Sequence, residues 1–142
     1  MLEVKNLYAR YGGSQILGGI DLQVAAGQGV ALLGRNGAGK TTLLKSVVGG
    51  DPDVSGEIRF LGKDLRPLPI YQRARAGLVL VPEDRRIFAH LTVEENLLMA
   101  RHGACGRGLA DSAEVYTLFP LLADLKSRMG DQLSGGQQQI LA

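Results

Sequence analysis

The stretch GVALLGRNGAGKTTLLKSVVGG, residues 29–50, decides the fold class that the sequence predicts. Its first part, GVALLG, is a compact apolar run of the kind found in strands that are covered on both faces. From Lys40 onward, apolar residues recur at helical spacing, and Gly49-Gly50 followed by Pro52 marks the end of a helix. A strand, a glycine-rich loop and a helix in this order indicate an α/β fold.

The loop between this strand and helix carries the pattern G-x-x-x-x-G-K-T, from Gly34 to Thr41, which is the P-loop motif. Glycines let backbone N–H groups approach phosphate oxygens closely, and the start of the helix adds the positive end of its dipole. Lys40 supplies a mobile positive charge for the terminal phosphates, while Thr41 offers a hydroxyl to Mg²⁺. A glycine-rich turn with an incidental lysine is the plain alternative, but the flanking strand and helix favour a phosphate site.

Other segments give weaker signals of secondary structure. Residues 2–11 and 21–28 read as strands, and residues 77–81 read as a second buried strand. Residues 55–65 predict a hairpin that turns at Gly62-Lys63-Asp64, with Ile58 and Phe60 on one face. Residues 69–77 predict a short helix that ends at Gly77.

After Pro82 the pattern becomes helical. A capping box, in which a side chain and a backbone amide at a helix start satisfy each other, is predicted at two places. One pairs Thr92 with Glu95, and the other pairs Asp111 with Glu114. We interpret the apolar stripes of these helices as ordinary packing surfaces.

Composition and charge argue against several classes of protein. The net charge is +2, and phosphate-backbone binding needs a sustained basic stripe, so we expect no nucleic-acid partner. Cys105 is the only cysteine, which excludes an internal disulfide. No apolar run approaches the roughly 20 residues of a membrane helix, and the start of the chain is unlike a signal peptide. We interpret the nearest thing to a basic cluster as a solvated face: Arg73, Arg75, Arg85 and Arg86, interrupted by Glu83 and Asp84.

A second glycine-rich helix start is LSGGQ, Leu133–Gln137. Ser134 and Gln137 predict another capping box, and Gly135 with Gly136 leaves the helix start bare, which makes it a second anion site. Taken alone, an ordinary helix cap explains this stretch equally well. Because a P-loop lies upstream in the same chain, we favour the interpretation of this stretch as a second anion site.

The two motifs together resemble the ATP-binding subunit of ABC transporters, and the resemblance covers the whole chain. It implies that Tyr11 is the aromatic residue that stacks on adenine. It also implies that the signature of one subunit closes over the γ-phosphate held by the P-loop of a second subunit. The implied ATP-binding residues of the Walker A motif are Gly34, Arg35, Asn36, Gly37, Ala38, Gly39, Lys40, Thr41 and Thr42, and the signature residues are Leu133, Ser134, Gly135, Gly136 and Gln137.

The resemblance also implies a fold and a set of partners. The expected fold is the P-loop NTPase fold of ABC type, α/β with an antiparallel β subdomain and a helical subdomain. We expect residues 1–142 to form an incomplete domain, with the β and P-loop core in about 1–85 and the helical subdomain and signature in about 86–142. The implied cofactors are ATP and Mg²⁺. The implied partners are transmembrane permease subunits, a second ABC ATPase subunit and, indirectly, a periplasmic substrate-binding protein, with the subunit peripheral on the cytoplasmic face of the cell membrane.

The segment LVPED, residues 80–84, takes the place of the family's Q-loop. The usual glutamine is replaced by Glu83, whose carboxylate can ligate Mg²⁺ together with Thr41. Residues 81–97 are similar in particular to subunits that serve branched-chain amino acid importers. Three alternatives stay open: an ATPase for urea or short amides, a soluble ABC ATPase that works without a transporter, and a nucleotide-binding fragment that is not an enzyme.

Two catalytic groups of the family lie beyond the signature, a Glu that ends the Walker B strand and a His on a switch loop. His90 and His102 both precede the signature, and Pro82 makes GLVLVPED a better Q-loop than a Walker B strand. We therefore expect no catalytic residue in this chain, which we interpret as truncated after the signature. We also expect GVALLG to expose its apolar face, and the 142-residue polypeptide to be poorly stable and inactive on its own.

Overall fold

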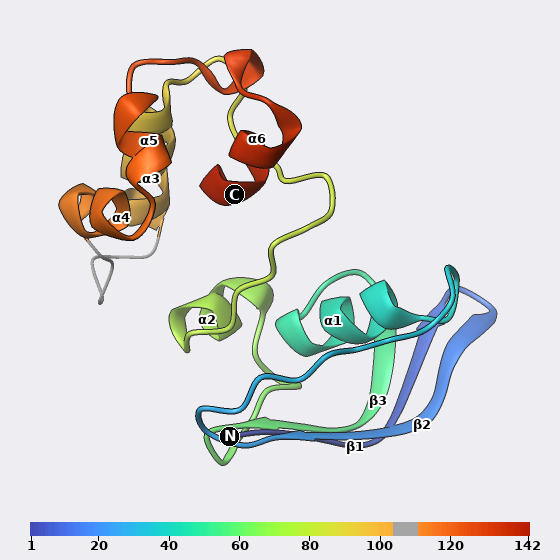
Figure 1. The fold of residues 1–142 in the computed structure, drawn as a ribbon. Helices are drawn as coiled ribbons and strands as arrows, with labels where there is room; N and C mark the ends of the chain where they lie inside the picture. Colours follow the sequence, from blue (N-terminus) through green and yellow to red (C-terminus); the bar gives the residue numbers. More distant parts are fainter. Residues whose placement is uncertain (104–110) are drawn as a thin grey trace. The chain divides into compact units, whose positions relative to one another are not determined.

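The computed structural model describes residues 1–103 and 111–142, and its chain divides into two compact units (Figure 1). The first unit is Met1–Leu80 and the second is Val81–Ala142. Each unit contains its own cluster of buried apolar side chains. Cys105, which the sequence excludes from any internal disulfide, lies outside the described residues.

The first unit is built on a four-stranded antiparallel sheet with the order β2-β1-β3-β4. Strand β1 pairs with both β2 and β3, so that Leu2 lies opposite Val24 on one side and Phe60 on the other. The predicted strand at 2–11 and the predicted hairpin are confirmed, although the hairpin turns one residue earlier, at Leu61-Gly62. The strands are β1 (Leu2–Tyr11), β2 (Ser14–Val24), β3 (Asp53–Phe60) and β4 (Lys63–Asp64).

A local irregularity in β1 requires a glycine on the neighbouring strand. The register between β1 and β3 shifts between Lys5 and Tyr8. At this point Asn6 has a φ of 49°, and its N–H donates to Oδ1 of Asp21 at 2.7 Å. Gly56 of β3 has a φ of 104°, and a Cβ on it would fall on the carbonyl oxygen of Asn6. Only glycine tolerates both the left-handed backbone and this close approach.

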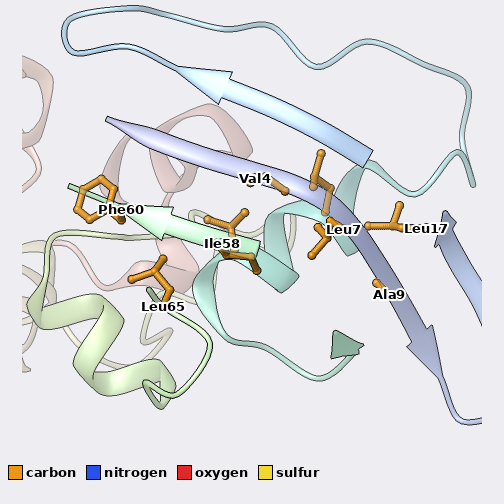
Figure 2. Packing of buried hydrophobic residues seen from close by; sticks show 9 residues of the cluster. Val4, Leu7, Ala9, Leu17, Ile58, Phe60 and Leu65 are labelled. Atoms are coloured by element: carbon orange, nitrogen blue, oxygen red, sulfur yellow. The ribbon is translucent and has the colours of Figure 1, made fainter. Parts of the chain in front are cut away.

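One face of the sheet packs against helix α1 (Lys40–Val48) to form the first core. Leu43 and Val47 of the helix are buried in the same cluster as Val4, Leu7 and Ile58 of the sheet. Figure 2 shows the last three side by side on β1 and β3. The predicted shared face of Ile58 and Phe60 is confirmed, since both are buried; the predicted helix is confirmed too, with Leu44 on its exposed side.

The C-terminal end of α1 is capped by a buried arginine from helix α2 (Ile70–Arg75). The guanidinium of Arg73 donates through Nη1 to the carbonyl oxygens of Ser46 and Val47, both at 2.9 Å. Burial lowers the pKa of Arg73, and the carbonyls at a helix end are favourable partners for a cation. The prediction that Arg73 belongs to a solvated face is therefore wrong, because the side chain satisfies carbonyls that the helix itself leaves unpaired.

Neither of the two predicted buried strands is present. Residues 29–34 and 77–81 are irregular, and Leu33 and Val79 are 88% and 79% exposed. A strand forms only when its N–H and C=O groups find a neighbour, and the sheet of the described residues consists of β1–β4 alone. The expected exposure of the apolar face of GVALLG is therefore confirmed.

The second unit is helical, as the sequence predicts. Its core contains Val93, Leu122, Leu125 and Leu133. The helix predicted from residue 111 is interrupted before Pro120, which cannot donate to the preceding turn. No helix in the described part of the chain is long and apolar enough to cross a membrane. The helices are α3 (Val93–Gly103), α4 (Ser112–Leu118), α5 (Pro120–Asp124), the short 3₁₀ helix η1 (Gly130–Gln132) and α6 (Gly135–Leu141).

The two capping boxes predicted in the helical block have different outcomes. The Thr92–Glu95 box is confirmed, because the Thr92 N–H donates to Oε2 of Glu95 at 2.7 Å and lowers the pKa of that carboxyl. The prediction of a capping box at Asp111 is wrong. Its side chain accepts no capping hydrogen bond, and Oδ1 lies 3.7 Å from Nη1 of Arg101 in an exposed ion pair.

Candidate nucleotide-binding site

Residues 34–39 form an exposed loop that leads directly into α1. Gly37 and Gly39 have φ values of 81° and 91°, which lie in the left-handed region that favours glycine. Gly39 is also the N-cap of α1, and a Cβ on it would lie 2.7 Å from Cδ2 of Leu17 in β2. The glycines at these two positions therefore allow the turn, and Gly39 also allows the close approach of the loop to the sheet.

Lys40 holds the two ends of this loop together. Its Nζ donates to the carbonyl oxygens of Gly34 at 2.7 Å and Arg35 at 2.8 Å. The Ala38 N–H donates to the Arg35 carbonyl at 3.2 Å, which closes the turn inside the loop. A positive charge thus lies at the start of a nine-residue helix, where N–H groups and the helix dipole also favour an anion.

The remaining residues predicted to contact ATP lie around this loop in the first unit. Thr41 and Thr42 both belong to the first turn of α1. Thr41 is exposed, whereas Thr42 is buried. Tyr11 ends β1 opposite Ser14 and is 39% exposed. The hairpin that carries Tyr11 reaches the loop, because the Ile16 side chain lies 3.6 Å from the position of a Cβ on Gly39. Arg35, Asn36 and Ala38 are exposed.

The predicted signature forms a capped helix start in the second unit. The Gln137 N–H donates to Oγ of Ser134 at 3.3 Å, and the Ser134 N–H donates to Oε1 of Gln137 at 2.8 Å. This capping box is confirmed. Gly135 and Gly136 are exposed at the first turn of α6, and Leu133 anchors the turn in the core. In the described part of the chain, the amides of Gly135 and Gly136 have no hydrogen-bond acceptor.

The segment before the signature is tied to the start of the helical block. The Gly130 N–H donates to the Leu91 carbonyl at 2.9 Å, and the Asp131 N–H donates to the Ala89 carbonyl at 3.0 Å. Asn96 is buried behind this contact, where its amide nitrogen donates to the carbonyl oxygens of Phe88 and Leu91. These hydrogen bonds fix the position from which the signature turn begins.

Glu83 is exposed in the turn formed by residues 82–86 of the second unit, whereas Thr41, the other predicted Mg²⁺ ligand, belongs to the first. Within the described residues, no group of three or more His, Cys, Asp or Glu side chains forms a metal-binding cluster. The prediction that Arg85 of the same turn belongs to a solvated face is wrong. Its guanidinium is half-buried and donates to Gln138 of α6 at 2.8 Å, a contact between distant residues that no local pattern indicates.

Comparison with known proteins identifies the family and several relatives. Residues 17–142 match the ABC transporter family. The chain is 38% identical to the high-affinity branched-chain amino acid transport ATP-binding protein BraG of Pseudomonas aeruginosa, covering 100% of this chain and 61% of BraG. It is 35% identical to the probable branched-chain amino acid transport ATP-binding protein LivF of Archaeoglobus fulgidus, with the same coverage. It is also 36% identical to the lipopolysaccharide export ATP-binding protein LptB of Escherichia coli, covering 97% of this chain and 58% of LptB.

Solved structures share the fold. A solved ATP-binding subunit of an ABC transporter superimposes with a TM-score of 0.78 at 32% identity, covering 99% of this chain and 59% of that subunit. The dimeric bacterial ABC transporter cassette MJ0796 gives a TM-score of 0.81 at 22% identity, covering 99% of this chain and 66% of the cassette. The chain spans about three fifths of the length of the curated relatives named above. The predicted α/β fold of ABC type is confirmed, and the chain belongs to the ABC transporter family of ATP-binding proteins.

Proposed function

We propose that this chain is the nucleotide-binding part of an ATPase subunit that powers an ABC importer. The observation that carries the proposal is Lys40, whose ammonium lies between the loop carbonyls of Gly34 and Arg35 at the start of α1. An ammonium on a flexible stem can exchange these carbonyls for phosphate oxygens, while the amides around Gly37 and Gly39 turn toward the same anion.

The other predicted site residues supply the remaining contacts of a bound nucleotide. Tyr11 offers an exposed ring for stacking on adenine, and its hairpin reaches the phosphate loop. The hydroxyl of Thr41 and the carboxylate of Glu83 are hard oxygen ligands of the type that Mg²⁺ selects. Mg²⁺ held by these two residues would supply positive charge that offsets part of the charge of the nucleotide phosphates.

The signature turn is proposed to act on a nucleotide held by a second subunit. The exposed amides of Gly135 and Gly136 support this role, since they point from a helix start that Leu133 and the capping box hold in place. Members of the family work with transmembrane permeases, and we propose such permeases as partners, together with a periplasmic substrate-binding protein. The subunit then lies on the cytoplasmic face of the cell membrane.

Branched-chain amino acids are the proposed cargo, supported by the similarity to BraG and LivF. The similar identity to LptB makes an export ATPase the second candidate. With the full-length protein and its permease in vesicles, we expect ATP-dependent uptake of labelled leucine. ATP hydrolysis without leucine uptake would contradict the cargo, and purification free of any membrane protein would favour a soluble ABC ATPase.

The 142-residue polypeptide itself is expected to bind ATP without turning it over. Hydrolysis requires a group that orients and deprotonates water, and neither the Walker B glutamate nor the switch histidine of the family has a counterpart in these residues. The measurement is phosphate release under excess ATP, with the full-length protein as the positive control. Release from the polypeptide above the background of its Lys40→Ala variant would show that another residue supplies this chemistry.

A further inference from the structure

We propose that Arg85 is a positioning residue that fixes the signature helix to the turn carrying Glu83. The inference rests on the proposed function, because it concerns the alignment of the signature with a partner subunit's nucleotide. All of the contacts that carry it lie within the second unit.

The guanidinium of Arg85 contacts the signature segment in two ways. Its Nη1 donates to Oε1 of Gln138 at 2.8 Å, from a position 53 residues away in the sequence. It also lies against the first residue of α6, since a Cβ on Gly135 would be 3.3 Å from Nη2 of Arg85. Gly135 thus offers an exposed amide and also lies next to the guanidinium of Arg85.

Gln138 extends this contact to both sides of the signature. Its Nε2 donates to the Gly130 carbonyl at 2.9 Å, and its backbone N–H donates to the Ser134 carbonyl at 2.9 Å. Arg85 therefore contacts a side chain that joins Gly130, three residues before the signature begins, to the helix after it. A change in the position of Arg85 moves the hydrogen-bond acceptor on which the orientation of α6 depends.

Fold stability does not account for this arrangement. Arg85 has a φ of 61° and Arg86 a φ of 54°, and consecutive left-handed residues without glycine are unfavourable. Nε of Arg85 is buried without a hydrogen-bond partner, which adds a desolvation cost. A positive charge beside the start of a helix also opposes the helix dipole. Strained and unsatisfied groups of this kind collect at functional positions.

The turn that presents Arg85 is the same turn that presents Glu83. The Arg85 N–H donates to the Pro82 carbonyl at 3.0 Å, which closes a tight turn around Glu83 and Asp84. Through the Arg85 side chain, the position of this turn is linked to the position of Gly135. We infer that Arg85 keeps the exposed amides of the signature aligned for the nucleotide across the dimer.

The test compares Arg85→Met with Arg86→Met in the full-length protein. Arg86 is a matched control, because its side chain is 72% exposed and forms a surface ion pair with Asp84 at 3.0 Å. Arg85→Met is expected to weaken ATP-driven dimerisation and to lower kcat by on the order of 10- to 100-fold, the cost of a misplaced group. The Kd of ATP for the monomer stays unchanged, and Arg86→Met behaves like the wild type.

Further variants separate positioning from stability. Arg85→Lys retains one donor for Gln138 and is expected to restore part of the loss. Gln138→Met cuts the same link, so the double variant Arg85→Met/Gln138→Met is expected to be no worse than either single variant. If Arg85→Met fails to fold, Gln138→Met carries the test through the same dimerisation assay.

Several outcomes would overturn the inference. Wild-type dimerisation in both Arg85→Met and Gln138→Met would do so, as would an equal loss in Arg86→Met. A wild-type protein that binds ATP but never dimerises would instead contradict the proposed function.

Discussion

Replacing Lys40 with alanine is expected to lower the affinity for ATP by at least about 100-fold. The ammonium makes two charge-assisted hydrogen bonds to the loop, at 2.7 and 2.8 Å, and would make equivalent bonds to phosphate oxygens. Each hydrogen bond to a charged group contributes about 1.5–3 kcal/mol, so losing two of them corresponds to two or more orders of magnitude. Isothermal titration of the protein with ATP measures the effect.

The same helix provides a matched control. Lys45 lies near the other end of α1, where its Nζ is 3.3 Å from Oδ2 of Asp51. Lys45→Ala removes an equal charge from the same helix and is expected to leave the affinity for ATP unchanged. If Lys40→Ala retained wild-type affinity, the assignment of residues 34–42 as the phosphate site would be wrong.

Gly56→Ala is expected to destabilise the protein by about 3 kcal/mol or more, since strained backbone and overpacking each cost about 1–3 kcal/mol. The φ of 104° is unfavourable for alanine. In addition, the new methyl group would fall on the Asn6 carbonyl oxygen and lie 2.8 Å from the Lys5 carbonyl oxygen. These are backbone atoms of the central strand, so they cannot move without breaking the pairing of β1. Urea unfolding monitored by circular dichroism measures the loss.

Two other glycines separate the causes of this loss. Gly12 has a φ of 55° with no atom within 4 Å of a Cβ, so Gly12→Ala reports the backbone strain alone. Gly13 has neither constraint, so Gly13→Ala is expected to be neutral. A Gly56→Ala variant no less stable than Gly12→Ala would show that β1 and β3 can separate locally without loss of the fold.

The elements that could be predicted from sequence are those determined by local signals. The helix at 40–48 has a left-handed glycine at each end, and the capping boxes at Thr92 and Ser134 use partners three residues away. The hairpin of β3 and β4 follows from alternation and a glycine turn. Each of these structures is formed by residues that are close in the sequence. The sequence pattern therefore contains all the residues whose interactions form the structure.

The features that sequence could not supply depend on distant partners. GVALLG has the composition of a strand, but composition does not provide the neighbour that a strand must pair with. Arg73 and Arg85 look alike in sequence, which predicts a solvated face for both. The first caps α1 and the second contacts α6, because carbonyl and amide oxygens far away in the chain reach them in space. At Asp111, the carboxylate lies in an exposed ion pair with Arg101 and not in the cap that its sequence position favours.

The pairing of Arg10 in β1 with Asp53 in β3 has a consequence for how the protein is made. Strands β1 and β2 leave the ribosome first, so their hairpin can pair before β3 is synthesised. The segment between β2 and β3, residues 25–52, contains the phosphate loop and α1, and its far end is not held until β3 pairs with β1. Closing so long a segment has an entropic cost and is slow. We therefore expect the phosphate loop and α1 to be fixed against the sheet late in synthesis, when β3 pairs with β1, and anything that delays this pairing delays the formation of the loop.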